Sequence, residues 1–271
     1  MPTETVNGCE LYYETSGDGT PIVFLHGVMM SCRFFDPQLD ALADAHRSIA
    51  LDFRGHGRSE TTPRGHTLPT YAADVERFLE TLGLDNVVLV GWSMGALVGW
   101  EYVDRFGTDR LRGLVVVEQQ PADLEREGYE YGSFDLDGLA ELLELVQTEP
   151  HAIAELYADR MFKNPLEGAR ERLVFDEIAR VPPGIKSAIL FDQSVRDYRS
   201  VLGAVDVPTL VCLGEGESVL EAGSVEYVAD HTPDAELERF SESDHCPFLE
   251  QPDRFNRVLD AFIGSLEPTA P

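Results

Sequence analysis

The segment that decides the fold is VVLVGWSMG, Val87 to Gly95, in which a short apolar run leads directly into a G-x-S-x-G pattern. A helical pattern follows through Tyr102, so the serine stands where a buried strand turns sharply into a helix. Such a turn crowds its neighbours, and glycines at 91 and 95 avoid Cβ clashes while Ser93 projects above the sheet. This context predicts a nucleophilic serine. The alternative is a serine that only caps a helix in a glycine-rich turn.

Apolar runs and helical patterns alternate on both sides of this segment. The helical pattern over 71–82 ends at Gly83, a typical end signal. Continuous apolar strands that alternate with amphipathic helices are typical of an α/β fold, with a mostly parallel central sheet and helices on both faces. The predicted strands are 10–14, 21–25, 48–53, 87–90, 113–117, 209–213 and 237–240.

The stretch between the strands at 113–117 and 209–213 is far longer than a usual connection between neighbouring strands. It lacks a strong strand signal and has helical patterns over 136–146, 152–162 and 166–178. We therefore expect an inserted helical cap at 122–204, on a core formed by 1–121 and 205–271. The cap is expected over the carboxyl edge of the sheet, where open α/β sheets bind their ligands.

A serine hydroxyl needs a base, because it is a weak nucleophile near neutral pH. Among seven histidines, His245 follows a predicted strand and begins the stretch H-C-P-F-L-E-Q-P, and it is the expected base. His56 lies in the glycine-rich loop 54–59, where a positioning role is expected. Four others are in polar, helical or turn contexts and are expected to be solvated: His46, His66, His151 and His231.

Four motifs together resemble the α/β-hydrolase superfamily, and within it the cap-bearing serine esterases and the cofactor-free haloperoxidase-like enzymes. They are L-H-G-V at 25–28, D-F-R-G-H-G-R-S at 52–59, G-W-S-M-G at 91–95 and S-D-H-C-P-F-L-E-Q-P at 243–252. The resemblance implies that Ser93 is the nucleophile and His245 the base. It also implies an oxyanion hole formed by the main-chain amides of Val28 and Met94, with no cofactor and no metal.

The third member of the triad departs from the family pattern. An Asp usually stands three residues after the Gly that ends the penultimate strand, and Glu217 holds that position after Gly214. A second family location is the end of the preceding core strand, where Glu118 stands. Either carboxylate would orient the imidazole and stabilise its protonated form. The spacing favours Glu217, with Glu118 as the alternative acid.

The charge is strongly unbalanced, with 49 acidic against 21 basic side chains and a net charge of −28. Such a surface repels nucleic acids and anionic membranes, which leaves a small-molecule substrate as the expected partner. Lys163 and Lys186 are the only lysines. This composition favours a protein adapted to high salt, with an acidic mesophilic protein as the alternative.

No apolar run is long enough for a membrane helix, and the first residues do not resemble a secretion signal. The four cysteines have no C-x-x-C spacing. Reduced thiols in a cytoplasmic protein are therefore expected, while the oligomeric state stays open.

Taken with the resemblance, these features predict a serine hydrolase that cleaves a small apolar ester or lactone through an acyl-enzyme. A cofactor-free perhydrolase or haloperoxidase would use the same catalytic residues. A non-catalytic ligand receptor or pseudoenzyme is the alternative from another class. Several large apolar residues are candidates either for an acyl pocket or for the core: Trp92, Met29, Met30, Phe34 and Phe35.

Overall fold

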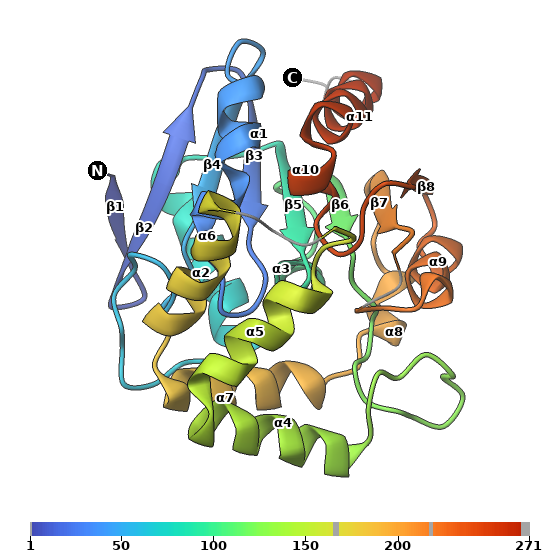
Figure 1. The fold of residues 1–271 in the computed structure, drawn as a ribbon. Helices are drawn as coiled ribbons and strands as arrows, with labels where there is room; N and C mark the ends of the chain where they lie inside the picture. Colours follow the sequence, from blue (N-terminus) through green and yellow to red (C-terminus); the bar gives the residue numbers. More distant parts are fainter. Residues whose placement is uncertain (1, 165–167, 217–218, 267–271) are drawn as a thin grey trace.

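The computed structural model describes residues 2–164, 168–216 and 219–266 (Figure 1). Its centre is an eight-stranded sheet with the order β1-β2-β4-β3-β5-β6-β7-β8. Strand β2 runs antiparallel to β1 and β4, whereas the strands from β4 to β8 pair in parallel. The strands are β1 (Thr3–Val6), β2 (Cys9–Ser16), β3 (Thr20–Leu25), β4 (His46–Leu51), β5 (Val87–Trp92), β6 (Leu111–Val117), β7 (Thr209–Gly214) and β8 (Ala235–Phe240).

The direction of each crossover places the helices on both faces of the sheet. From β3 to β4 the chain moves one way along the sheet, and from β4 to β5 and β5 to β6 it moves the other way. Right-handed crossovers therefore put α1 (Asp36–Ala41) on one face, and α2 (Leu68–Leu82) and α3 (Met94–Phe106) on the opposite face. Helix α11 (Pro252–Ser265) contacts α1 and thus covers the same face.

This arrangement confirms the α/β fold expected from the alternating pattern. The central strands β5, β6 and β7 are buried almost throughout, because helices cover both sides of the sheet. The first strand, β1, was not predicted. It pairs with β2 through a tight turn at Asn7 and Gly8, which both adopt positive φ angles of 48° and 72°.

The segment between β6 and β7 is mainly helical. Figure 1 shows α4, α5 and α7 beyond the end of the sheet where the parallel strands finish. Helix α4 contacts α7, and α5 contacts α6. The helices of this segment are α4 (Leu136–Thr148), α5 (Pro150–Arg160), α6 (Ala169–Arg180), α7 (Pro183–Ser194) and α8 (Arg199–Leu202).

Shorter elements complete the described fold. A 3-10 helix, η1 (Cys32–Phe35), precedes α1, and α9 (Ala222–His231) connects β7 to β8. Helix α10 (Pro247–Glu250) directly follows the predicted base. Within residues 2–164, 168–216 and 219–266, no helix combines the length and apolar character needed to cross a membrane.

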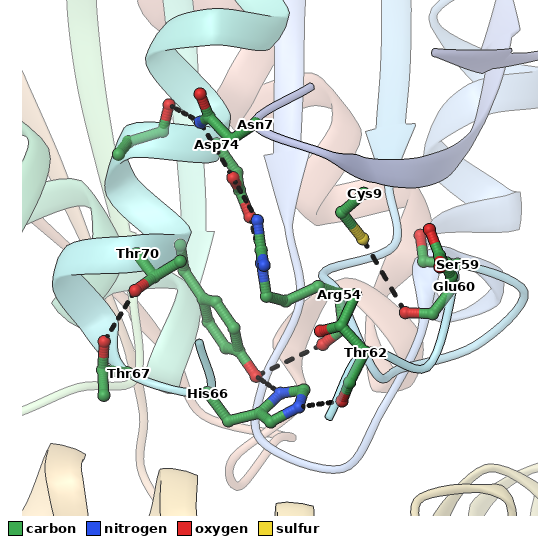
Figure 2. Close-up of polar contacts among 12 residues, drawn as sticks. Asn7, Cys9, Arg54, Ser59, Glu60, Thr62, His66, Thr67, Thr70 and Asp74 are labelled. Atoms are coloured by element: carbon green, nitrogen blue, oxygen red, sulfur yellow. Dashed lines mark hydrogen bonds and ion pairs between the residues drawn. The ribbon is translucent and has the colours of Figure 1, made fainter. Parts of the chain in front are cut away.

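A buried polar network anchors the loop after β4 to α2 (Figure 2). The Arg54 guanidinium donates to both carboxylate oxygens of Asp74, over 2.6 and 2.7 Å, and Asn7 Nδ2 donates to Asp74 Oδ1 over 3.0 Å. Bidentate geometry of this kind fixes both partners. The Arg54 guanidinium therefore anchors the loop that carries the motif D-F-R-G-H-G-R-S at 52–59.

Two histidines expected to be solvated are instead buried, and that prediction was wrong for both. His66 lies beneath α2, with Nε2 2.8 Å from the carbonyl oxygen of Thr62 and Nδ1 3.4 Å from the Tyr71 hydroxyl (Figure 2). His46 Nε2 lies 2.8 Å from Asp260 Oδ1 on α11. Asp260 is distant from His46 in the sequence, and Thr62 contacts His66 across a turn. The polarity of the neighbouring residues could therefore not predict that the two histidines are buried. His151 and His231 are exposed as expected.

Candidate active site

Ser93 occupies a strained turn between β5 and α3. Its φ of 52° and ψ of −124° lie in a region that non-glycine residues rarely adopt. A Cβ at Gly91 would lie 2.5 Å from the amide nitrogen of Ala96, and one at Gly95 would lie 2.1 Å from the carbonyl oxygen of Leu25. Gly91 therefore lets the end of β5 pass close to the first turn of α3, and Gly95 lets that turn pack against β3, which is the avoidance of Cβ clashes that the sequence pattern predicted.

The ends of neighbouring strands hold the two proposed catalytic residues in place. The Ser93 amide donates to the carbonyl oxygen of Val117 at the end of β6, over 3.0 Å. Trp92 Nε1 donates to the carbonyl oxygen of His245 over 2.8 Å. The residue before the serine therefore fixes the loop that carries the histidine.

Glu118 is the carboxylate that the described structure places behind His245. Its Oε2 lies 3.4 Å from His245 Nδ1, and its Oε1 accepts the Gly214 amide over 2.6 Å. Glu118 is 2% exposed and directly follows β6, with a positive φ of 49°. Glu217, which spacing favoured as the acid, lies outside the described residues, and that prediction is not tested.

Burial dominates the protonation of this pair. It lowers the pKa of His245 to about 4, against the opposing negative charges of Asp244 and Asp123. Burial also raises the pKa of the Glu118 carboxyl, and the hydrogen bond from the Gly214 amide opposes this shift. A neutral imidazole at neutral pH has the free lone pair that a general base requires.

The two amides expected to form an oxyanion hole lie beside the serine turn. Met94 begins α3 directly after Ser93. A Cβ on Gly27 would lie 3.3 Å from the Ser93 Cβ, which places the loop before Val28 against the serine. No partner among the described residues accepts a hydrogen bond from the amide of Val28 or Met94.

His26 supports this loop from below. Its Nε2 accepts the Phe53 amide over 3.1 Å, so Nδ1 carries the proton and donates to the carbonyl oxygen of Gly27 over 2.8 Å. His26 is fully buried. It holds the turn that precedes the amide of Val28.

Ser93 and His245 face a common cavity of about 380 Å³. Apolar side chains from the segment between β6 and β7 form much of its wall, which suits a small organic ligand. They include Leu142, Leu156, Met161 and Leu190, with Val219 and Leu220 from the loop after β7. The five large residues considered for the pocket at 29, 30, 34, 35 and 92 are all buried in the core and are not part of this wall.

Sequence reasoning missed a polar part of the cavity wall. Gln119 and Asp123, which follow β6, and Gln193 on α7 all line the cavity with Ser93. The run E-Q-Q-P-A-D at 118–123 directly follows a buried strand at the carboxyl edge of the sheet. Polar residues at that position could have been recognised as ligand-facing.

A mostly parallel sheet with a serine at a strained strand-to-helix turn and a histidine after the last strand defines the α/β-hydrolase class. The chain belongs to this family, because residues 20–252 match the family described as the alpha/beta hydrolase fold.

Known proteins support the same assignment. The chain is 31% identical to the non-heme chloroperoxidase CPO-A1 of Kitasatospora aureofaciens, over 96% of this chain and 98% of that protein. It is 30% identical to the AB hydrolase superfamily protein YisY of Bacillus subtilis, over 94% and 96% of the two chains. The structure of an esterase from Exiguobacterium antarcticum superimposes with a TM-score of 0.92 at 25% identity, over 97% and 98% of the chains. The bromoperoxidase of Bacillus anthracis gives 0.89 at 26% identity, over 95% and 96%. These similarities identify the chain as a hydrolase.

Proposed function

We propose that this protein is a serine hydrolase that cleaves a small apolar ester or lactone. The observation that carries the proposal is the placement of Ser93 and His245 on one cavity, with Glu118 3.4 Å behind the imidazole. The apolar wall supports a small organic acyl or alcohol group. Similarity to an esterase structure supports the same substrate class.

In the proposed reaction, Ser93 Oγ attacks the carbonyl carbon while its proton passes to His245 Nε2. The amides of Val28 and Met94 would stabilise the negative charge that develops on the carbonyl oxygen. Protonation of the leaving oxygen by His245 releases the alcohol and leaves an acyl-enzyme. Water, deprotonated by His245, then attacks the acyl carbon and releases the acid while Ser93 regains its proton.

We assign the acid of the triad to Glu118. Its contact with Nδ1 directs the other imidazole nitrogen toward the cavity, and the Gly214 amide fixes its second oxygen. A carboxylate in this place holds the tautomer and stabilises the imidazolium formed during attack.

We also propose that residues 122–204 act as the cap, and that the protein works in the cytoplasm, where its four buried thiols stay reduced.

Perhydrolysis is the second candidate reaction. The chloroperoxidase and bromoperoxidase relatives favour it, since both are similar over nearly the whole chain. Hydrogen peroxide would replace water in attacking the same acyl-enzyme and give a peracid. Formation of peracid from acetate and hydrogen peroxide, measured beside ester hydrolysis, tells which nucleophile the site prefers.

Hydrolysis of p-nitrophenyl acetate tests the proposal directly. We expect turnover by the native protein, none above background for Ser93→Ala, and native rates for the exposed control Ser241→Ala. A fluorophosphonate should label Ser93 at one equivalent per chain, as identified by peptide mass spectrometry. Absence of both turnover and labelling would overturn the hydrolase proposal and favour a ligand-binding role.

A further inference from the structure

One carboxyl group in the cavity wall has no place in the proposed reaction. Asp123 lies on the loop after β6, is 7% exposed, and lines the same cavity as Ser93 and His245. Its Oδ1 accepts a hydrogen bond from Gln119 Nε2 and its Oδ2 accepts one from Gln193 Nε2, each over 3.2 Å. Both donors are neutral and both bonds are at the long end of the usual range.

The negative charge of Asp123 is not balanced by a contacting cation. Among the described side chains, no Lys, Arg or His nitrogen lies within 4.0 Å of its carboxylate. Arg126, whose charge acts on Asp123, donates instead to the carbonyl oxygens of Val195 and Arg196 and lies 3.8 Å from Asp197. Burying an ionised carboxylate without a counter-charge is costly, so a ligand cation would stabilise it.

Two further polar atoms, on residues that line the same cavity, have no hydrogen-bond partner in the described structure. They are Gln193 Oε1 and Ser194 Oγ, both buried, on the last turn of α7. Ser194 is 1% exposed, and both residues line the cavity. A buried polar atom left unpaired costs free energy, so such atoms in a ligand cavity indicate groups that the ligand pairs.

The unused hydrogen-bonding capacity of Asp123, Gln193 and Ser194 is mainly for accepting hydrogen bonds. The amide oxygen of Gln193 and the carboxylate of Asp123 can only accept, while the Ser194 hydroxyl can donate or accept. Burial raises the pKa of Asp123 to about 6, so the carboxyl is mostly ionised at neutral pH. The complementary ligand group is a donor with several N–H bonds and a positive charge.

We propose that Asp123, Gln193 and Ser194 form a subsite for a protonated amino group of the substrate. This inference rests on the proposed hydrolase function and narrows its substrate class to esters or lactones that carry an ammonium group. The apolar chain between the ammonium and the ester carbonyl would lie against Leu142, Leu156 and Leu190, which line the same cavity.

Binding can be tested without turnover in the Ser93→Ala protein. Calorimetry with n-alkylammonium ions of about three to six carbons should detect binding that alcohols of equal length do not show. The titrations are done in about 0.5 M KCl, because salt screens the general attraction of an acidic surface for cations. Asp123→Asn on the Ser93→Ala background should weaken alkylammonium binding at least about tenfold.

Asp104→Asn is the matched control, because it removes the same charge from an exposed position on α3. It should bind alkylammonium ions like its Ser93→Ala parent. Equal affinity for ammonium ions and alcohols, or equal weakening by both Asn substitutions, would overturn the subsite. A merely structural role for Asp123 predicts a lower melting temperature with no change in this selectivity.

Kinetics with matched substrates give an independent readout. Methyl esters of ω-amino acids should have a higher kcat/KM than neutral alkanoate esters of the same chain length. Asp123→Asn should reduce this ratio at least about tenfold, chiefly through KM. An unchanged ratio would overturn the subsite while leaving the hydrolase proposal intact. If no ester is hydrolysed, the hydrolase proposal fails, and the calorimetry alone decides whether the subsite exists.

Discussion

Backbone strain gathers around the proposed catalytic residues. Five non-glycine residues with positive φ are found in the described chain, and two of them, Asn7 and Asn86, are asparagines, which tolerate that region. The other three are Met29, Ser93 and Glu118, with φ of 63°, 52° and 49°. They belong respectively to the loop of the proposed oxyanion hole, the nucleophile turn and the strand end behind the base. Packing against neighbouring strands must compensate for this cost.

The role of Glu118 leads to a kinetic prediction. Loss of its charge removes stabilisation of an imidazolium that exists only after proton transfer, so kcat should suffer more than KM. We expect Glu118→Gln to lower kcat at least about a hundredfold, which corresponds to about 2.7 kcal/mol of transition-state stabilisation. Steady-state hydrolysis of p-nitrophenyl acetate measures it.

Two comparisons make that result specific. Glu215→Gln changes an exposed carboxylate that faces Arg239 and should keep native kinetics. Glu217→Gln should cost less than about tenfold. A larger loss of kcat for Glu217→Gln than for Glu118→Gln would mean that Glu217 is the triad acid, as the sequence spacing favours. Comparable large losses would mean that both carboxylates serve the base.

The burial of His245 leads to a prediction about pH. The imidazole is inactive as a base when protonated, and burial lowers its pKa to about 4. The acid limb of kcat/KM should therefore lie below pH 6, so that activity persists under mildly acidic conditions where an ordinary histidine is largely protonated. Initial rates with a neutral ester, corrected for folding by circular dichroism, test this. An inflection of kcat/KM at pH 6.5 or above would contradict this prediction. It would show that the negative charge of the triad acid raises the pKa of His245 more than burial lowers it.

At the scale of single residues, the sequence predicts a nucleophile and a base because each belongs to a local pattern, and the structure places both residues on one cavity. The acid is different, since both candidate carboxylates follow strand ends that meet at one edge of the sheet. Which oxygen reaches Nδ1 depends on the angle of a loop, and motif spacing does not define that angle. The same limit hid Asp123, whose two donors come from positions 119 and 193.

At the scale of elements, apolar continuity predicted the central strands within a few residues. Strand β5 extends to Trp92 instead of ending at 90, and helix α2 begins at Leu68, three residues before the predicted start. Pro69 in its first turn explains the earlier start, since proline is well accommodated there. Strand β1 escaped prediction because it is short, lies at the sheet edge and has only one buried residue, Val6.

Helix α7 contains a buried lysine that gives a stability prediction. Lys186 is 1% exposed, and no acidic partner lies within 4.0 Å in the described structure. Burial lowers its pKa below 10.5. Between the lowered pKa and 10.5 the unfolded chain binds a proton that the folded chain does not. The contribution of Lys186 to the free energy of unfolding should therefore rise with pH across that interval.

Replacement by an apolar side chain should remove this dependence. We expect Lys186→Met to raise the free energy of unfolding at pH 7 by about 1 kcal/mol or more, and the difference from the native protein to shrink as the pH approaches 10. Urea unfolding at several pH values measures both effects. Lys163→Met, at an exposed site, is the control. A destabilised Lys186→Met protein would contradict this prediction.

At the scale of the whole molecule, the net charge of −28 distinguishes this chain. The described ion pairs mostly join an arginine to one or two neighbouring carboxylates, and exposed pairs of this kind contribute little stability each. The excess carboxylates thus remain uncompensated on the surface. Their mutual repulsion opposes the compact state whenever counter-ions are dilute.

Salt should therefore stabilise the fold, and this is the most direct test of adaptation to high salt. We expect the melting temperature to rise between about 0.1 M and 2 M KCl, a range in which the Debye length falls to about 3 Å. A variant in which the exposed Glu141, Glu144 and Glu155 of α4 and α5 are replaced by Gln should begin at a higher melting temperature and rise less. Differential scanning calorimetry of both proteins at pH 7.5 measures the two slopes. A flat native profile would contradict the adaptation, and equal slopes would mean that salt acts through the buried apolar surface instead of the surface charge.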